Sequence, residues 1–482
     1  MNKSSYVYGS LILSLVMGGC SAIGPDYAKP STAVPENFRY SDTNNSKEKA
    51  VDKEWWKSFN DPQLSESIDL ALLNNQDIQT AGASVDSLLG KFDQAKSYLY
   101  PQINGNGSFD RKGVNNASTG GVQLREGVTS TYASSLSLVS YEIDLFGKVR
   151  RANEAARALL LSSEYARQTL RLSIASSVAA SYITLSSLEE QITLAQANFQ
   201  ASHDIEEQSA LKYRYGSINE SVYLQAQSAA QSAKATLSQL QSLKIAEEGR
   251  FNLLLGRNPQ AVKTTALESI HLPEVPEAIP STIMTHRPDI AVAEQNLISA
   301  NAQIGIARAA YYPSIKLTGM LGLQSLELTD FITNPAKIWE LTPSVSIPIF
   351  SAGLIEGGIK IAEAEQHKTL LQYQKAIITA FNDADTAIGQ NTQAKQQLNF
   401  QIASQKAIQK AFEQTKLRYK VGTIAYSDLL LVQQQWLQVS QSTQIAKQNA
   451  LIASINLYKA LGGGWDSTDN ALPKLSLLPS GR

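Results

Sequence analysis

The sequence predicts a mainly α-helical chain with a small β part, in which long coiled-coil helices accompany four strands long enough to span a membrane. Three observations lead to this fold class. The chain is a duplication with a period near 210 residues, two very long runs lack proline, and four shorter segments alternate apolar and polar residues. A period of this length indicates a doubled domain rather than a solenoid of small repeats.

The duplication is clearest in a stretch that occurs twice, as L-K-Y-R-Y-G-S-I at 211–218 and as L-R-Y-K-V-G-T-I at 417–424. The offset is 417 − 211 = 206 residues. Each copy lies between two long helical patterns, and its Gly can take the positive φ that a helix end requires. We expect each copy to form the tip of a helical hairpin. Any such hairpin could carry a Gly, but two copies with basic residues interleaved with Tyr favour a shared docking surface.

The composition excludes several functional classes. Lysine plus arginine number 42 against 43 acidic residues, so the net charge of −1 implies no broad basic surface for nucleic acid. The four histidines are scattered, without the paired spacing of a metal site. No G-x-S-x-G, P-loop or dinucleotide fingerprint occurs. The sequence therefore gives no indication of an enzyme, a metal or a cofactor.

The N-terminus is typical of a signal peptide. Lys3 precedes a mainly apolar run from Val7 to Met17, which is too short to cross a bilayer as a helix. Cys20 follows and is the only cysteine, so no internal disulfide can form. A lone Cys at this place resembles the lipobox of bacterial lipoproteins, which implies lipidation of Cys20, although Met17 stands where Leu is usual. Ser21 after the Cys favours sorting to the outer membrane. The alternative is a buried, inert thiol.

The segment after this cysteine is rich in Pro, Asn, Ser and charge, without a period, and is expected to be an extended tether. The aromatic motif W-W-x-x-F at 55–59 then opens the first helix, with Asp61 or Ser65 as candidate caps. This helix is expected to run to residue 98. Pro101 ends it, because a proline disfavours helical geometry in the residue before it.

Four segments change from the helical period of 3.6 to the strand period of 2: 103–110, 131–145, 315–323 and 341–349. In the second of them the apolar phase slips by one residue, which predicts a β-bulge. Strands of this length can span a membrane, whereas a soluble sheet with one wet face shows the same alternation. A spanning sheet must close, and four strands are too few. A membrane location would therefore require several chains to pool their strands.

Two runs are expected to be very long helices, since 148–215 has neither Gly nor Pro and 349–472 has no Pro. About 65 residues at 1.5 Å each reach on the order of 100 Å, beyond a compact domain. Apolar and small residues step by four and three, as in coiled-coil seams. The expected seams are Ile174, Val178, Ser181, Leu185, Leu188, Ile192, Ala195 and Phe199 in one helix, and Val432, Trp436, Val439, Thr443, Ala446, Ala450, Ala453, Leu457 and Ala460 in another.

The predicted organisation has six parts. They are a signal peptide at 1–19, a lipidated N-terminal tether at 20–62, a first structural repeat at 63–256, a connector at 257–280, a second structural repeat at 281–462 and a polar C-terminal tail at 463–482. Each repeat is expected to contain a helix, a strand pair (near 102–146 and near 314–350) and a long hairpin with its tip at 211–218 or 417–424.

A series of motifs along nearly the whole chain carries a family resemblance. They are Cys20-x-x-x-Gly24-Pro25-Asp26-Tyr27, Trp55-Trp56 with Asp61-Pro62, Arg287-Pro288-Asp289-Ile290, the Tyr-Pro pairs at 100 and 312, Tyr141 to Phe146, and the two tip motifs. In this order they resemble the outer membrane factors of the TolC type, and among these the lipidated branch similar to OprM.

The resemblance implies a homotrimer whose twelve pooled strands form one outer membrane β-barrel, continued by an α-helical tunnel into the periplasm. Such proteins are passive exit ducts for drugs or other small molecules, with no cofactor. Their partners are a periplasmic adaptor (membrane fusion protein), an inner membrane efflux pump, here of the RND type, and outer membrane lipid. The implied localisation is the outer membrane, lipid-anchored, with a large periplasmic part.

The resemblance also assigns roles at the tips. The adaptor-docking residues would be Lys212, Tyr213, Gly216, Arg418 and Gly422. A periplasmic gate would consist of Tyr419 and Asp428, the latter six residues after the tip Gly (422 + 6 = 428). Three-fold symmetry would make a ring of three Asp428 carboxylates that attracts cations.

This chain departs from the family pattern at the gate. Leu431 stands where many members have a second Asp, Val222 is the first-half counterpart of Asp428, and Ile424 replaces an Arg of some members. The constriction is therefore expected to be more apolar. Asp428 also has a simpler explanation, since a carboxylate in the first turn of a helix is favoured by the helix dipole.

Two other functions are alternatives to the duct. A periplasmic coiled-coil lipoprotein acting as spacer or adaptor would have the helices, but it has no need of two strand pairs of this length. A surface hydrolase would need a catalytic constellation that the sequence does not contain.

Overall fold

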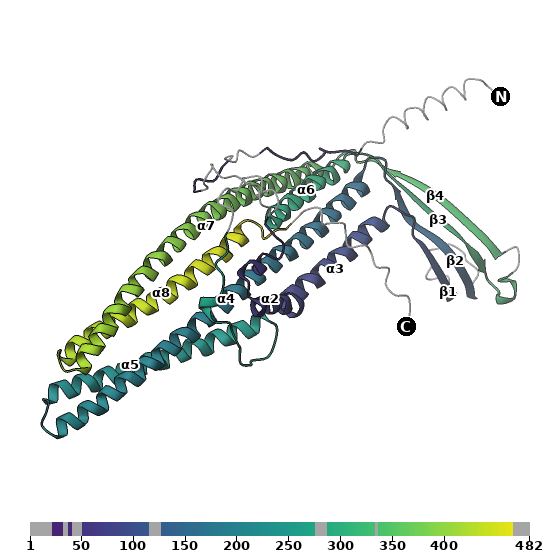
Figure 1. The fold of residues 1–482 in the computed structure, drawn as a ribbon. Helices are drawn as coiled ribbons and strands as arrows, with labels where there is room; N and C mark the ends of the chain where they lie inside the picture. Colours follow the sequence, from purple (N-terminus) through teal and green to yellow (C-terminus); the bar gives the residue numbers. More distant parts are fainter. Residues whose placement is uncertain are drawn as a thin grey trace. The chain divides into compact units, whose positions relative to one another are not determined.

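Long helices account for most of this protein in the computed structural model (Figure 1). The structure describes residues 22–31, 37–40, 51–114, 127–274, 287–332 and 336–465. The expected signal peptide, Cys20 and the tail from residue 466 onward lie outside the described residues.

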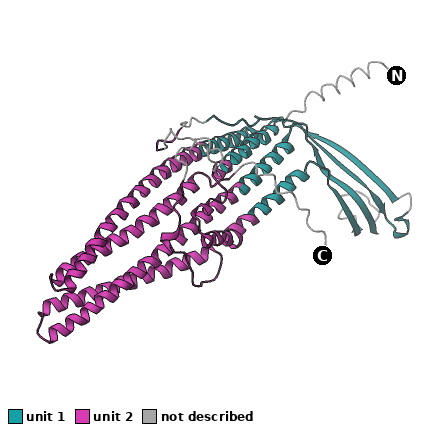
Figure 2. Cartoon of the chain, viewed as in Figure 1, with its two compact units in different colours: residues 1–31, 84–164, 292–373 teal, residues 32–83, 165–291, 374–482 magenta. Residues whose placement is uncertain are grey.

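The chain forms two compact units (Figure 2), each built from both halves of the duplication. Unit 1 takes its described residues from 1–31, 84–164 and 292–373. Unit 2 takes its described residues from 32–83, 165–291 and 374–482. The units therefore do not coincide with the two sequence repeats, because corresponding parts of the repeats associate with each other.

Unit 1 contains one four-stranded antiparallel sheet in the order β1-β2-β3-β4. Its strands are β1 (Ile103–Val114), β2 (Gly127–Ile143), β3 (Ser314–Ser325) and β4 (Lys337–Ser346). The register shifts between Leu138 and Tyr141 of β2, which confirms the expected bulge. β4 ends earlier than the alternation to residue 349 predicted, and Pro348 lacks the N–H that a further ladder bond would need. A short 3-10 turn, η5 (Leu328–Asp330), lies between β3 and β4.

One face of this sheet carries large apolar side chains that are exposed in the described part of the chain. Leu136 pairs with Leu321, which in turn pairs with Trp339. These three side chains are 58%, 64% and 78% exposed. Positions of the opposite parity are mostly polar, as in the pair of Lys316 with Ser344. Within the described chain β1 and β4 are edge strands, so the sheet is open on both sides.

The first helix is interrupted, in contrast to the single helix that the sequence predicted. The 3-10 helix η1 (Trp55–Phe59) is followed by α2 (Pro62–Asn74) and α3 (Gln76–Ser97). Asp61 caps α2 as expected by accepting from the N–H groups of the second and third residues after it. Asn75 ends α2 and starts α3, because its Oδ1 accepts from the N–H of Asp77 and Ile78 at 3.0 and 3.2 Å. Its Nδ2 also donates to the Leu254 carbonyl at 2.9 Å.

The long hairpins have equal lengths in the two halves, as a duplication requires. α4 (Lys148–Arg214) and α7 (Leu354–Lys420) each have 67 residues, and α5 (Glu220–Leu254) and α8 (Tyr426–Ala460) each have 35. α6 (Pro288–Ala309) and the 3-10 turn η3 (Leu267–Ser269) complete the elements of the described residues. In unit 2, α5 runs back along α4, and α8 runs back along α7 (Figure 1). None of the helices in the described part of the chain combines the length and apolar character needed to cross a bilayer.

The expected seam is correct for α4 and only partly correct for α8. Val178 and Leu185 of α4 are fully buried. In α8 most of the expected seam residues from Thr443 onward are buried. Nearer the tip, the buried residues are Gln433 and Ser440, whereas the expected Val432, Trp436 and Val439 are only half-buried. The burial of the polar Gln433 side chain is compensated by a hydrogen bond, which its Nε2 donates to Oδ1 of Asn198 on α4 at 2.9 Å.

The start of the expected tether is a packed segment of unit 1 rather than free chain. Within residues 22–31, Gly24 lies so close to Gly305 of α6 that a Cβ on it would come within 2.5 Å of the Gly305 Cα. Arg151 of α4 is buried and its Nη2 bonds Asp26 Oδ1 at 2.6 Å. These contacts tie the segment to helices from both halves of the chain.

Candidate functional site at the hairpin tips

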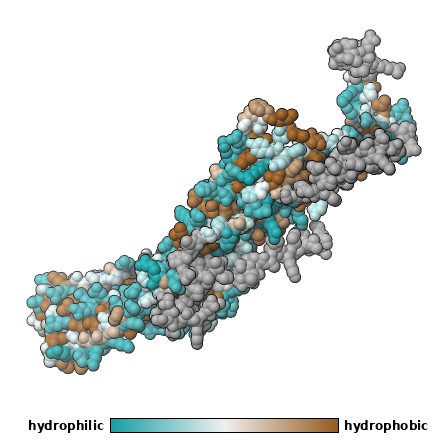
Figure 3. Space-filling view, turned by 90° about the horizontal axis from the view of Figure 1, so that it is seen from above, coloured by the Kyte–Doolittle hydropathy of each residue, from teal (hydrophilic) through white to brown (hydrophobic). Residues whose placement is uncertain are grey.

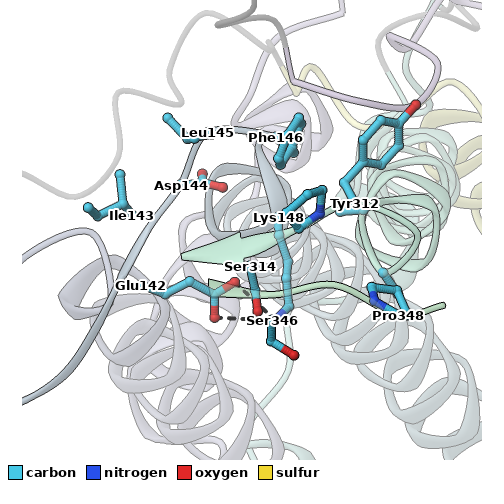
Figure 4. A pocket seen from close by; sticks show the side chains of 13 residues that line it. Glu142, Ile143, Asp144, Leu145, Phe146, Lys148, Tyr312, Ser314, Ser346 and Pro348 are labelled. Carbon is cyan, nitrogen blue, oxygen red and sulfur yellow. Dashed lines mark hydrogen bonds and ion pairs between the residues drawn. The ribbon is translucent and has the colours of Figure 1, made fainter. Parts of the chain in front are cut away.

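A hollow of about 290 Å³ in unit 1 is the first candidate, at the junction where β2 is followed by α4 (Figure 4). Its charged groups are paired with each other, since Lys148 Nζ lies 3.2 Å from Glu142 Oε1. The rings of Phe146 and Tyr312 pack with centroids 4.8 Å apart. Throughout the described ranges, no group of three or more His, Cys, Asp and Glu side chains could hold a metal ion. The hollow therefore offers no set of free ligands or catalytic groups.

The first hairpin tip, at 211–218, ends α4 with a tightly bonded turn. The N–H of Ser217 donates to the Lys212 carbonyl at 2.8 Å, and the N–H of Gly216 donates to the Tyr213 carbonyl at 2.9 Å. This pair of bonds is the Schellman arrangement, which requires positive φ at the residue after the helix. Gly216 supplies it with a φ of 72°.

The second tip, at 417–424, repeats this geometry. Thr423 donates to the Arg418 carbonyl at 3.0 Å, Gly422 donates to the Tyr419 carbonyl at 3.0 Å, and the φ of Gly422 is 75°. The helix ends that the repeated motif predicted are thus present in both halves.

The helices that follow the tips begin differently. α5 is capped by Asn219, whose Oδ1 accepts from the N–H of Val222 at 3.1 Å. The corresponding residue before α8 is Ala425 (219 + 206), which supplies no side-chain cap. Asp428 lies in the first turn of α8, where its charge is favourable to the helix dipole.

Both tips present basic and apolar side chains to the outside. Lys212 and Arg418, expected to dock an adaptor, are exposed, as are the adjacent basic residues of each tip. Tyr215 is 80% exposed and Val421 is 65% exposed. Figure 3 shows small hydrophobic areas interspersed with hydrophilic ones over the tip end of unit 2. The Tyr213 ring stacks on the Tyr223 ring of α5, with centroids 5.7 Å apart.

The two hairpins are joined close to the tips by a cluster of apolar side chains, referred to below as the tip cluster. Its buried members are Ala226, Tyr426 and Leu429, which are 0%, 7% and 4% exposed. The half-buried members packed against them are Ile205, Val222, Phe412, Tyr419 and Leu430. The tip cluster therefore takes side chains from α4, α5, α7 and α8.

Charge and ring contacts extend the tip cluster toward the surface. Lys212 of the first hairpin places its Nζ 6.0 Å from the ring centroid of Tyr419 in the second, at the outer limit for a cation–π interaction. The rings of Tyr419 and Tyr426 lie 6.0 Å apart. Burial, with a smaller contribution from Tyr419, raises the pKa of Tyr426 to about 12.

The two expected gate residues lie in different environments. Tyr419 is half-buried within the tip cluster, whereas Asp428 is exposed on the first turn of α8. Among the described residues no ion pair engages the Asp428 carboxylate. The expected lipidation residue, Cys20, lies outside the described residues.

Sequence reasoning missed Tyr426, the largest buried side chain of the tip cluster. A signal was present, since the 206-residue offset places Tyr426 opposite Glu220 (220 + 206 = 426), an exchange of an acid for an aromatic ring. The pattern of one helix does not show that this ring is buried, because the tip cluster around it combines side chains of four helices from both hairpins.

A comparison with protein families identifies both halves of the chain. The model described as outer membrane efflux protein matches residues 67–257 and again residues 279–463. The two matches contain the two hairpins and the four strands described above.

Individual relatives are similar over almost the entire chain. The probable efflux pump outer membrane protein TtgC of Pseudomonas putida is 31% identical, over 94% of this chain and 94% of its own length. The probable outer membrane lipoprotein SilC of Salmonella typhimurium is 30% identical, over 95% of this chain and 98% of its own. The solved structure of the CmeC outer membrane channel of Campylobacter jejuni has a TM-score of 0.86 at 25% identity, over 93% of this chain and 97% of that one.

Proposed function

Because the chain belongs to the family of outer membrane efflux proteins, we propose that three copies of it form the outer membrane exit duct of a tripartite efflux system. The single observation that carries this proposal is the open, four-stranded sheet of unit 1 with its exposed apolar side chains. The matched names describe efflux proteins and channels, and we expect a passive channel without catalytic activity.

The sheet supports pooling of strands between chains. Leu321 and Trp339 are exposed on one face, as lipid-facing side chains of a barrel would be. The edge strands β1 and β4 carry main-chain groups that lipid cannot satisfy. Four strands are too few to close a spanning barrel, which starts at about eight. Three chains would pair β4 of one copy with β1 of the next and close twelve strands.

The tips are the proposed docking site for a periplasmic adaptor. Lys212, Tyr213 and Gly216 of the first tip, and Arg418 and Gly422 of the second, lie in exposed turns of matching geometry. An adaptor that binds both turns would contact the same backbone conformation twice in each chain. An inner membrane efflux pump, of the RND type by resemblance, would supply the energy through that adaptor.

Tyr419 and Asp428 are proposed to form the periplasmic gate. The exposure of Asp428 supports a role in which its carboxylate meets the passing ion, and three copies would create a local preference for cations. Tyr419 would act differently, since it is packed in the tip cluster. Its proposed role is to keep the two hairpins together.

Cys20 is proposed to carry a lipid, and it lies outside the described residues. The first residue described after it, Ala22, lies against Gly147, so close that a Cβ on the glycine would come within 2.4 Å of the Ala22 Cβ. The proposal is supported by the relative SilC, which is named as a probable outer membrane lipoprotein.

The test is the mass of the protein extracted from the outer membrane by detergent, measured by native mass spectrometry. The expected species has three times the mass of one chain and gives single chains after heating in denaturant. In a second experiment, the Cys20→Ala variant is produced with a conventional signal peptide. It should remain in the membrane, because strands that form a barrel stay inserted without the lipid. A monomer that is released as soluble protein would instead favour the spacer lipoprotein.

A further inference from the structure

The apolar face of the four-stranded sheet carries charge at one end only. All four strands join helices at the other end, since α3 precedes β1 and α6 precedes β3, whereas α4 follows β2 and α7 follows β4 (Figure 1). The end away from these helices, referred to below as the far end, contains the last residues of β1 and β3 and the first residues of β2 and β4. Arg111, near the end of β1, and Lys337, the first residue of β4, both lie there.

Both basic residues are on the face whose large side chains are apolar. Arg111 comes two positions after Phe109 on β1, and Lys337 comes two positions before Trp339 on β4. Residues two apart in a strand point to the same face. The registers of the three strand pairs put Phe109 and Trp339 on one face, where they are 58% and 78% exposed. Lys337 itself pairs with Leu323 of β3.

The described part of the protein does not neutralise these two charges. Lys112, next to Arg111, points to the opposite face, and its Nζ lies 2.7 Å from Oδ2 of Asp110. Among the described residues no ion pair engages Arg111 or Lys337, and both residues are exposed. The acidic residues of the four strands all have the parity of the polar face; they are Asp110, Glu142 and Glu340. Arg111 and Lys337 are therefore the only charged strand residues on the apolar face.

The position of these charges along the strands matches a membrane boundary. Val345 lies on the apolar face of β4, eight residues from Lys337 (345 − 337), which is roughly 27 Å of strand. With a tilt of about 40°, this length covers roughly 20 Å of membrane thickness, close to the height of the apolar band of such barrels. Aromatic side chains such as Trp339 are typical of the boundary, and a basic side chain on the lipid face is tolerated best there. In the proposed duct the helices lie in the periplasm, so the far end lies at the outer leaflet.

Closure of the proposed barrel brings the two charges together. Within one chain they belong to opposite edges of the sheet, because β1 and β4 are its first and last strands. When β4 of one copy pairs antiparallel with β1 of the next, Lys337 approaches the end of β1 that carries Arg111, on the same face. Neighbouring strands lie about 4.8 Å apart, and like charges opposite each other destabilise a sheet. An anion bound between the two side chains would remove this repulsion.

We propose that Lys337 of one copy and Arg111 of the next bind a phosphate of lipopolysaccharide in the outer leaflet, which gives three such sites in the trimer. The inference deepens the proposed function and rests on it. The guanidinium of Arg111 can donate two parallel hydrogen bonds to phosphate oxygens, and the Lys337 ammonium adds a second positive charge. The acyl chains of the same lipid would run along the apolar face, where Leu321 and Trp339 are exposed. A phosphate at the boundary with acyl chains below it thus fits both the charges and the apolar surface.

The first experiment titrates the purified trimer in detergent with bisphosphorylated lipid A, the membrane anchor of lipopolysaccharide, and counts the bound lipids by native mass spectrometry. Arg111→Gln and Lys337→Gln should each weaken binding on the order of tenfold, because each removes a charge-assisted contact to phosphate. Lys112→Gln is the matched control. It removes the neighbouring positive charge from the opposite face of β1 and should bind lipid A as the unmodified protein does. Equal binding by all four proteins would overturn the site.

A second measurement needs no variant and covers the case in which a substitution prevents assembly. The unmodified trimer should bind bisphosphorylated lipid A more tightly than the dephosphorylated lipid, on the order of tenfold or more. Inorganic phosphate at the same concentration should not displace it, because inorganic phosphate has no acyl chains for the apolar face. Equal binding of the two lipids would mean that the basic side chains only reach toward water, and would overturn the phosphate site. Displacement by inorganic phosphate would overturn the lipid as the ligand.

The outcomes separate the lipid site from the function on which it rests. An unmodified protein that is monomeric before any lipid is added contradicts the exit duct itself. A trimer whose lipid binding depends neither on the two basic residues nor on the phosphate contradicts only the lipid site.

Discussion

Gly216 and Gly422, 206 residues apart, occupy the same position in the same helix-ending turn, with φ values of 72° and 75°. In both turns the residue after the Gly bonds back to the carbonyl five positions earlier. A Cβ added at either Gly would meet no atom within 4 Å beyond its chain neighbours. The two tips are therefore restricted by backbone conformation alone, and not by packing.

Valine at Gly216 or Gly422 should weaken the proposed docking of an adaptor without dissociating the proposed trimer. The left-handed conformation costs a residue with a side chain roughly 1–2 kcal/mol, which the turn can avoid only by changing shape. Cross-linking to the periplasmic adaptor in cells should fall for both variants. Gly90→Ala is the control. Gly90 lies within α3, and a Cβ added there would meet no atom within 4 Å outside the backbone of that helix. Normal cross-linking in both tip variants would count against docking at these turns.

Asp428→Asn should reduce the preference for cations in planar bilayers while leaving assembly intact. The substitution keeps the shape of the exposed side chain and removes three negative charges from the trimer. The measurement is the reversal potential in a salt gradient. Glu220→Gln, which removes an exposed charge from the first turn of α5, should leave selectivity unchanged. If Asp428→Asn has no effect either, Asp428 does not belong to the gate.

Arg151→Met should detach the segment at residues 22–31 from the helices of unit 1 on which it packs. The buried guanidinium bonds Asp26 at 2.6 Å and Glu154 at 2.8 Å, and hydrogen bonds to a charged group contribute roughly 2 kcal/mol. The expected result is a lower thermal midpoint and faster proteolysis between residues 22 and 31. Lys29→Ala removes an exposed ion pair with Glu294 and should change the midpoint little. Equal protease resistance of the Arg151 variant and the unmodified protein would contradict this role.

The raised pKa of Tyr426 predicts that the folded protein loses stability in strongly alkaline solution. Its pKa of about 12 in the folded protein is above the ordinary value of 10.0, so the folded state holds the proton more tightly than the unfolded chain. The stabilising effect is complete below pH 10 and is lost as the pH rises through 12. Tyr426→Phe should therefore lose less thermal stability than the unmodified protein between pH 10 and pH 12. An identical pH dependence of the two midpoints would show that this hydroxyl does not ionise on unfolding.

Asn75 illustrates why part of the fold was not predictable from sequence. The apolar pattern on both sides of it continues, so a single helix to residue 98 was expected. In the structure its Oδ1 caps α3 and its Nδ2 bonds the carbonyl of Leu254, about 180 residues away. The bond to that distant carbonyl is a tertiary contact that a local pattern does not contain. The burial of Tyr426 likewise depends on side chains from other helices.

The sequence by itself determined the duplication, the presence of the very long helices, the turns at Gly216 and Gly422 and the alternation of the strands. These features follow from backbone preferences and periodicities that act within one or two turns of the chain. Only the tertiary structure decided that the strand pairs of the two halves join into one sheet, and that Tyr426 is buried while Asp428 stays exposed. Burial depends on which segments meet, and the tip cluster around Tyr426 includes Ala226, which lies 200 positions earlier in the sequence (426 − 226).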